Sequence, residues 1–419
     1  MMYLTDQSRE DTGASAAKSP QNAGISRRFL PKKTRLEGVS LGTLKKRYIR
    51  YGGGFMEATR IKDMRIYSAI SKISKPIADS THDISKIAFY VVEVETEGGV
   101  VGQGNLLSFH YSPNAIEGAL KDLRHFILAR GYHINEMLRV QKDYEIESEY
   151  FGIVGIQRWA LATLNTAMWD AWCRTLGQPI WKVMGGSARR IPVYGSGGWI
   201  SYTDQELLDE VLDYKSRGFT AVKIKVGHPD GIGRDIERLT RCREALGPDV
   251  KIMMDANQGM DVPSAVKLIH QAENLGIFWF EEPVVNTDFE GYATIHSKTK
   301  ISLAMGEREY STVALRELIG RRALDLWQPD LIRLGGVDAW RDSAALAEAY
   351  NIPVLPHYYK DYDVPLLCTV RKPYGAESFD WIDDIIDNTM RIENGFAYPR
   401  EGAGWGFRFK PEALVPVKD

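Results

Sequence analysis

The stretches KIMMD (251–255), GIFWFE (276–281) and ISLAMGE (301–307) are three short apolar runs that each end at a carboxylate. The acids Asp255, Glu281 and Glu307 follow one another at intervals of 26 residues. A strand, a loop, a helix and a second loop occupy about 30 residues in a βαβ unit. The spacing therefore predicts three successive parallel strands that carry an acid at the same end.

The alternation of strand and helix patterns continues on both sides of these runs. Amphipathic helix patterns such as 264–274 and 339–350 separate the strands. Eight strands that alternate with helices predict an α/β fold built on a (β/α)-type barrel. The other five strand patterns occupy residues 190–194, 219–226, 324–330, 352–357 and 375–379.

The residues before the barrel show a different pattern. Strands are predicted at 65–73 and 87–97 with a hairpin partner at 100–104, and helices at 112–130 and 154–176. This order of elements predicts a separate α+β unit that precedes the barrel.

These patterns divide the chain into four parts. We expect an α+β capping domain over residues 64–186, a catalytic barrel over 187–387, and a C-terminal segment over 388–419 that packs back on the capping domain. Residues 1–63 are basic and rich in Ser, Gly and Lys, which favours a disordered or misassigned extension.

The composition is that of an ordinary soluble protein. The 419 residues are 44% hydrophobic and 26% charged, with a net charge of −2, which gives no indication of nucleic-acid binding. No apolar run approaches the ~20 residues that cross a membrane. The three cysteines lack any CxxC pairing, which favours a reducing compartment and a cytoplasmic protein.

The three strand-end carboxylates are candidate metal ligands. The C-terminal ends of the strands of a parallel barrel converge on one mouth. Three acids that meet there repel one another unless a cation lies between them, and an all-oxygen site with room for water suits Mg²⁺ better than zinc. A single acid at a strand end could instead cap a helix or form a salt bridge, but the equal spacing of all three favours the metal site.

Two further groups at strand ends are candidate proton-transfer residues. Lys223 and Lys225 lie on one face of a strand, where desolvation and mutual repulsion are expected to lower one lysine pKa toward neutrality and create a base. Asp330 and His357 end the sixth and seventh predicted strands, so the carboxylate is expected to orient the imidazole ring. Glu377 ends the eighth.

The motifs at these strand ends resemble the mandelate racemase subgroup of the enolase superfamily. The resemblance covers roughly Met64 to the C-terminus, and a helix that carries AMWDA (167–171), followed by GQPIW (177–181), adds to it. It implies a (β/α)7β barrel with an N-terminal capping domain. The strand-end motifs are KIK (223–225), DAN (255–257), EEP (281–283), GE (306–307), QPD (328–330) and PH (356–357).

The resemblance also implies a role for each candidate residue. The three carboxylates would bind one Mg²⁺ per subunit, Lys225 would act as a base on one face of the substrate, and the Asp330–His357 dyad would act as acid or base on the other. Lys223 would neutralise the substrate carboxylate and Glu377 would hydrogen-bond to it. Family members tend to form symmetric assemblies, so a homo-oligomer is expected.

The capping loops are expected to decide the reaction. Residues 78–83 and 107–112 offer polar side chains for substrate hydroxyl groups, and we take His82, His110 and Tyr111, together with Asn257, as candidate substrate-binding residues. A racemase for an aromatic acid should instead cover the mouth with apolar side chains.

The sequence therefore favours the Mg²⁺-dependent dehydration of a small acid sugar, an aldonate or aldarate, to a 2-keto-3-deoxy acid. A racemase or epimerase of a 2-hydroxy acid is the first alternative. A non-catalytic barrel is a second. A metal-dependent hydrolase is disfavoured because His357 is the only histidine at a strand end.

Overall fold

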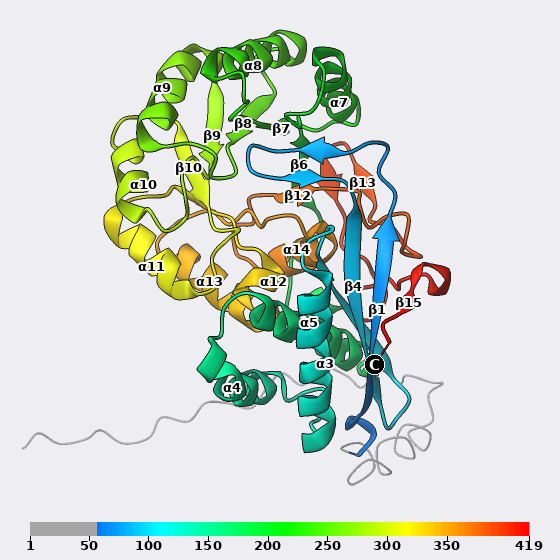
Figure 1. Ribbon diagram of the computed structural model, residues 1–419. Helices are drawn as coiled ribbons and strands as arrows, with labels where there is room; N and C mark the ends of the chain where they lie inside the picture. Colours follow the sequence, from blue (N-terminus) through cyan, green and yellow to red (C-terminus); the bar gives the residue numbers. More distant parts are fainter. Residues whose placement is uncertain (1–56, 419) are drawn as a thin grey trace, which may run out of the picture. The chain divides into compact units, whose positions relative to one another are not determined.

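A computed structural model describes residues 57–418 (Figure 1). Parallel strands form a barrel in which each strand pairs with the next along the chain, and β12 closes the barrel on β6. The seventh position has only an isolated bridge, Trp327 to Val354, because the prolines around Val354 lack the N–H groups that a longer ladder needs. The barrel strands are β6 (Ile191–Gly197), β7 (Ala221–Lys225), β8 (Lys251–Asp255), β9 (Ile277–Glu281), β10 (Ser302–Met305), β11 (Leu326–Trp327) and β12 (Ala376–Ser378).

Helices cover the outside of the barrel (Figure 1). They are amphipathic, and α9 buries Leu268 and Ile269 against the strands. Side chains such as Thr203 and Asp261 accept hydrogen bonds from backbone N–H groups and so fix where α7 and α9 begin. The helices of the barrel are α7 (Asp204–Ser216), α8 (Ile232–Leu246), α9 (Val262–Ala272), α10 (Phe289–His296), α11 (Thr312–Arg321), α12 (Leu331–Leu334), α13 (Val337–Ala349) and α14 (Lys360–Leu367).

The barrel interior is filled by side chains, so the barrel is a packed core. Tyr194 and Trp279 meet edge to face with ring centroids 5.3 Å apart. Together with Met253, Ala304 and Leu355 they form a small buried cluster. Because side chains alternate along a strand, the next inward positions toward the C-terminal ends carry the polar residues.

The capping domain is an antiparallel sheet with helices packed on it. The sheet order is β15-β1-β4-β5, so the C-terminal strand β15 adds to the edge of a sheet built from the start of the described chain. Strand β1 begins at Ile61, so the predicted boundary between residues 63 and 64 falls inside it. The elements are β1 (Ile61–Ser71), β4 (Ile87–Thr96), β5 (Val101–Leu107), β15 (Val415–Pro416), α3 (Pro113–Arg130), α4 (Met137–Ser148) and α5 (Ile156–Thr175).

The (β/α)7β barrel with its α+β cap confirms the predicted fold. The prediction for residues 1–56 lies outside the described part of the chain. Helix α4 was not predicted from the sequence. Within residues 57–418, no helix is both long and apolar enough to cross a membrane.

A buried carboxylate joins the C-terminal segment to the capping domain. Asp170 on α5 is 0% exposed and accepts hydrogen bonds from the backbone N–H groups of Gln103 on β5 and Trp405 in the C-terminal segment, at 3.0 and 2.8 Å. Its charge is balanced by Arg174 one helical turn later, at 2.7 Å. One side chain therefore connects a strand, a helix and the last part of the chain.

We expect Asp170→Ala to lower the free energy of unfolding by about 3 kcal/mol, because it leaves the buried N–H groups of Gln103 and Trp405 without a partner and removes the carboxylate that pairs with Arg174. Urea unfolding followed by circular dichroism measures this change. The matched control is Asp213→Ala on α7. Asp213 pairs with Arg217 four residues later, as Asp170 pairs with Arg174, but the Asp213 side chain is 60% exposed. Its cost should stay below about 0.5 kcal/mol, and equal costs for the two variants would contradict the connecting role of Asp170.

Candidate active site

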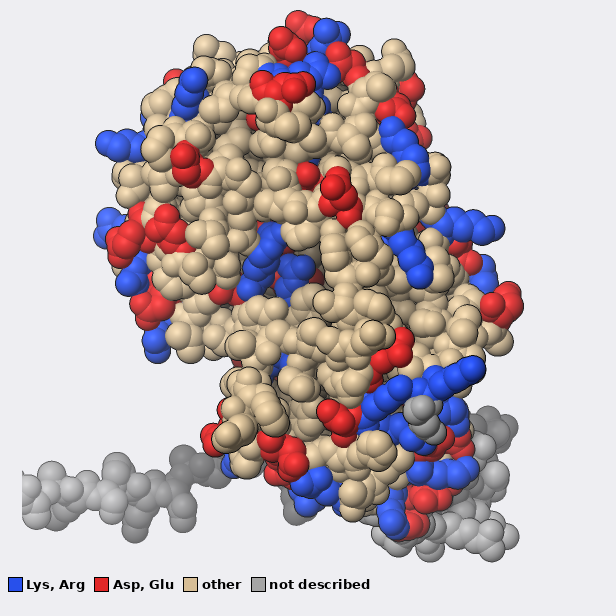
Figure 2. Space-filling model, in the orientation of Figure 1, with Lys and Arg blue, Asp and Glu red and all other residues tan. Residues whose placement is uncertain are grey.

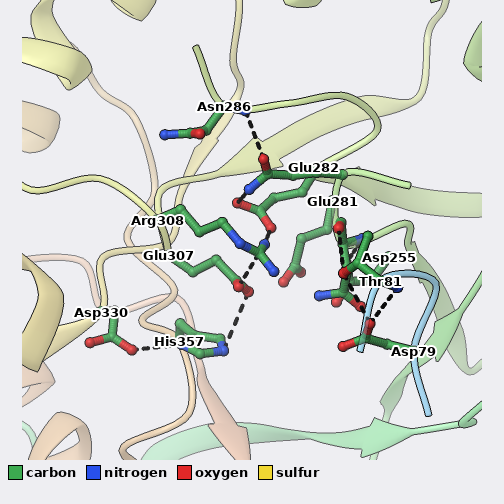
Figure 3. Close-up of polar contacts among 12 residues, drawn as sticks. Asp79, Thr81, Asp255, Glu281, Glu282, Asn286, Glu307, Arg308, Asp330 and His357 are labelled. Atoms are coloured by element: carbon green, nitrogen blue, oxygen red, sulfur yellow. Dashed lines mark hydrogen bonds and ion pairs between the residues drawn. The ribbon is translucent and has the colours of Figure 1, made fainter. Parts of the chain in front are cut away.

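The three predicted metal ligands meet at the mouth of the barrel. Asp255 and Glu281 end β8 and β9 and pair in register, and Glu307 follows β10 by two residues. Ligand atoms from the three carboxylates lie within 4.8 Å of one another, and all three residues are buried (Figure 3). Burial and the neighbouring charge of Asp255 raise the pKa of Glu281 to about 7.

The donor set fits a hard divalent cation. All its ligand atoms are carboxylate oxygens, as Mg²⁺ prefers. The Oε2 atom of Glu307 is buried and has no hydrogen-bond partner, although His357 Nε2 lies 3.3 Å from it. A cation at this place would satisfy that oxygen and remove the repulsion that raises the pKa of Glu281.

The two lysines on β7 lie directly against these acids. The Nζ atom of Lys223 lies 2.5 Å from Glu281 and 2.7 Å from Glu377, and that of Lys225 lies 2.6 Å from Asp255. Burial alone would lower both lysine pKa values, but the carboxylates outweigh it and raise them. The prediction that repulsion lowers one lysine pKa toward neutrality is therefore wrong for this arrangement.

The predicted dyad is formed. The Nδ1 atom of His357 lies 2.8 Å from Asp330 Oδ2, and Asp330 is itself held by the backbone N–H groups of Ile332 and Arg333 at 2.9 and 2.8 Å. The other ring nitrogen, Nε2, lies 3.3 Å from Glu307 (Figure 3). Burial alone would lower the pKa of His357, but Glu307 and Asp330 raise it.

A cavity of about 250 Å³ lies over these groups, between the barrel and the capping domain. Figure 2 shows Lys and Arg side chains at the bottom of a hollow that is surrounded mainly by uncharged residues. Lys223 does not line this cavity, so it contacts Glu281 and Glu377 from behind. The predicted site residues that do line it are Lys225, Asn257, Glu307, Asp330, His357, Glu377, His82 and Tyr111.

The polar capping loop differs from expectation. The Oδ1 atom of Asp79 accepts hydrogen bonds from the backbone N–H groups of Thr81 and His82, at 2.8 and 2.7 Å, and from the Thr81 hydroxyl at 3.1 Å. The Tyr111 hydroxyl donates to the backbone oxygen of Asp83 at 2.8 Å. Several hydrogen-bonding groups of the loop are therefore paired with other groups of the protein.

His110 does not line the cavity, so its assignment as a substrate-binding residue stays a prediction. It is exposed, and its ring packs on Tyr111 with centroids 4.2 Å apart.

Asn257 is held in an unusual backbone conformation beside the metal ligands. Its φ is 42°, a left-handed value that is uncommon outside glycine, and its N–H donates to Asp255 Oδ1 at 2.9 Å. The side-chain Oδ1 atom of Asn257 is buried without a hydrogen-bond partner and the residue lines the cavity. An unpaired acceptor therefore lies next to the reacting groups.

Several residues at the site were not predicted as functional. Arg308 forms ion pairs with Glu282 and, at 2.9 Å, with Glu307 (Figure 3), and Arg333 lies 3.3 Å from Glu307. Gln328 donates to Glu281 at 2.6 Å. Each of Arg308, Arg333 and Gln328 lies one to three residues from an acid at a predicted strand end, and this position in the sequence could have identified them as site residues.

Comparisons with known proteins agree with this geometry. Residues 61–185 match the N-terminal domain of mandelate racemase / muconate lactonizing enzyme, and residues 206–413 match the enolase C-terminal domain-like family. The L-talarate/galactarate dehydratase of Salmonella typhimurium is 25% identical over 84% of this chain and 90% of its own length. Its structure with Mg and L-lyxarohydroxamate aligns with a TM-score of 0.80 over 84% of this chain and 92% of that one.

Two further relatives show the range of the family. The arabinonate dehydratase of Saccharolobus solfataricus is 29% identical over 78% of this chain and 89% of its own. A Bradyrhizobium enolase complexed with magnesium and mandelic acid is 26% identical, with a TM-score of 0.77 over 85% of this chain and 98% of that one. With both domains matched and the strand-end residues assembled, the chain belongs to the enolase superfamily, in the mandelate racemase subgroup.

Proposed function

We propose that this protein is a Mg²⁺-dependent hydro-lyase that removes the proton next to a carboxylate and dehydrates an acid sugar to a 2-keto-3-deoxy acid. One observation carries the proposal. Lys225 and the carboxylate-oriented His357 line a single cavity, and a buried all-oxygen cation site meets the same cavity through Glu307. The Salmonella and Saccharolobus relatives are dehydratases of sugar acids, which supports the same reaction for this chain.

Asp255, Glu281 and Glu307 would hold the ion. When bound, Mg²⁺ supplies positive charge beside the substrate carboxylate, where negative charge develops as the α-proton leaves. Glu377 lines the cavity next to this place and is kept ionised: burial alone would raise its pKa, but Lys223 lowers it to about 2.

Lys225 is proposed to accept the α-proton. Its ammonium group is held by Asp255, so it becomes a base only when that contact weakens. A cation held by Asp255 would compete with the Lys225 ammonium group for that carboxylate. The nearby charge of Lys223 then favours the neutral amine.

His357 is proposed to donate a proton to the departing β-hydroxyl group. Glu307 and Asp330 raise its pKa against the effect of burial, which favours the protonated ring that a general acid needs. Lys225 is on the second barrel strand and His357 follows the seventh, so the two groups reach the cavity from different sides of the barrel. The α-proton and the hydroxyl leave as water, and the resulting enol becomes a 2-keto acid.

Racemisation of a 2-hydroxy acid is the second candidate. Racemisation would use the same two proton-transfer groups. A proton would return to the opposite face of the α-carbon, and no hydroxide would leave the β-carbon. The specific observation in its favour is that aromatic side chains line part of the cavity, and the Bradyrhizobium relative is complexed with an aromatic 2-hydroxy acid. Formation of 2-keto acid identifies the dehydratase, and change of optical rotation without 2-keto acid identifies the racemase.

Activity is expected to depend on a bound divalent cation. Chelation should abolish activity and Mg²⁺ should restore it, and Glu281→Gln should weaken Mg²⁺ binding by at least about ten-fold because it removes an anionic ligand. Isothermal titration calorimetry measures the affinity. The matched control is Glu309→Gln, which alters a nearby buried glutamate that pairs with Asn286 outside the carboxylate cluster. Full activity in excess chelator would overturn the metal assignment.

The second prediction separates the two proton-transfer groups. One positioned acid or base contributes typically about 10²–10⁴ in rate, so Lys225→Ala and His357→Asn should each abolish net dehydration while Mg²⁺ binding is retained. His357→Asn should still exchange the α-proton with deuterium from solvent, whereas Lys225→Ala should not. The opposite pattern in NMR-detected exchange would reverse the two roles, and normal dehydration by either variant would exclude this arrangement.

A further inference from the structure

The walls of the active-site cavity differ sharply from its floor. The carboxylates and Lys225 lie where the barrel strands end, whereas the surfaces above them are formed largely by aromatic and aliphatic side chains. This division was not expected from the polar sequence of the capping loops.

An aromatic cluster forms one wall. Trp381 stacks on Phe379 at 4.4 Å and on Trp199 at 5.9 Å between ring centroids, and it meets Phe109 edge to face at 5.6 Å. Tyr358 packs against Trp381 at 5.5 Å. All five residues line the cavity, and their mutual packing holds the rings in place.

Aliphatic side chains form the facing wall. Four come from the capping domain, and the fifth, Ile332, comes from α12 beside the dyad. Several are almost fully buried, with Ile84 at 2% and Ile332 at 1% exposure. The five are Ile84, Leu107, Ile116, Ile156 and Ile332.

Polar groups on these walls are mostly paired within the protein. The Ser108 hydroxyl donates to the backbone oxygen of Ala88 at 3.1 Å, and the Tyr359 hydroxyl accepts from the N–H of Leu107 at 3.0 Å. Arg308 and Arg333 both pair with Glu307 at the floor. The buried polar atoms without a hydrogen-bond partner on cavity-lining residues include Asn257 Oδ1 beside the metal ligands, Glu307 Oε2 at the floor and the indole Nε1 of Trp159.

From this separation of polar floor and apolar walls we infer that the substrate carries its hydroxyl groups next to the carboxylate and is apolar beyond carbon 3. The inference rests on the proposed function and narrows its substrate to an acid sugar deoxygenated beyond carbon 3, that is, a 2,3-dihydroxy acid with a hydrocarbon tail. The tail packs between the aromatic and aliphatic walls. Asn257 Oδ1 accepts a hydrogen bond from one of the two hydroxyls.

The reaction balances for this substrate class. In R–CH(OH)–CH(OH)–COO⁻ the α-proton leaves carbon 2 and hydroxide leaves carbon 3, which together make one water molecule. The remaining enol, R–CH=C(OH)–COO⁻, takes a proton at carbon 3 and releases the proton of its hydroxyl group at carbon 2, which gives the 2-keto acid R–CH₂–CO–COO⁻. No oxidant or further reactant is needed.

A matched substrate series tests the inference. The Mg²⁺-loaded enzyme is given the stereoisomers of 2,3-dihydroxyhexanoate, hexonates of the same configuration at carbons 2 and 3, and a hexarate. Each additional hydroxyl without a partner on an apolar wall should cost roughly ten-fold in affinity. We therefore expect kcat/KM for 2-keto acid formation to favour a dihydroxyhexanoate by at least about ten-fold.

Preference for a hexonate would overturn the inference. Preference for the hexarate would also overturn it and assign Arg308 and Arg333 to a second carboxylate. Two further measurements separate the proposed function from the inference about the tail. α-Proton exchange in D₂O is measured with every compound and tests the proposed function. Calorimetry compares the binding of 2-hydroxyhexanoate with that of a hexonate and tests the preference for an apolar tail. If no compound exchanges, the proposed function fails, and the binding comparison still decides whether the cavity prefers an apolar tail.

Variants in the walls supply a second test. Trp381→Gln should shift the kcat/KM ratio toward the hexonate, because it replaces a wall aromatic with a polar side chain. Tyr374→Gln is the control, since this half-exposed tyrosine lies before β12, at the opposite end of the strand from Trp381, and is absent from the cavity lining. An unchanged ratio in Trp381→Gln, with the fold intact by circular dichroism, would contradict the role of the aromatic wall.

Discussion

The buried charges at the mouth of the barrel constrain most of the structure. Asp255 and Glu281 are fully buried, and so is Lys223, which bridges Glu281 and Glu377. Buried charges are costly unless they are paired, so every strand that carries one must hold its position against the next. Register between β7, β8 and β9 is therefore an electrostatic requirement as well as a packing one.

The division of labour between the two domains follows from this constraint. The barrel supplies the charged floor, because strand ends are rigid enough to keep acids and bases at hydrogen-bond distance. The capping domain supplies much of the apolar wall and has few charges of its own at the cavity. Closing the cap over the floor excludes water, which strengthens the electrostatic interactions below it.

Much of the fold and the floor of the site could be predicted from local patterns. The spacing of Asp255, Glu281 and Glu307 and the period of two in Lys223 and Lys225 both reflect strand geometry, which the sequence carries directly. The dyad of Asp330 and His357 followed from the order of the strands. The positions of these residues at the site follow from the strand that carries each of them, so local sequence patterns are enough to predict them.

What could not be predicted depends on contacts between distant segments. The direction of the Lys225 pKa depends on how closely Asp255 approaches it, and strand patterns do not contain that distance. Polar residues such as Asp79 and Thr81 looked available to a substrate, but they bond to each other once the loop folds. The aromatic wall combines Trp199 and Trp381, which are far apart in the chain and meet only when β12 closes on β6.

The pairing of β15 with β1 has a consequence for synthesis of the chain. The sheet of the capping domain gains its outer strand only after residues 415–416 leave the ribosome, and Asp170 gains its hydrogen bond from Trp405 only after the whole barrel has been made. Until then β1 has an open edge, which exposes backbone groups to pairing with other chains. The capping domain therefore begins before the barrel is made and is completed after it, and a nascent chain stalled within the barrel would present that edge.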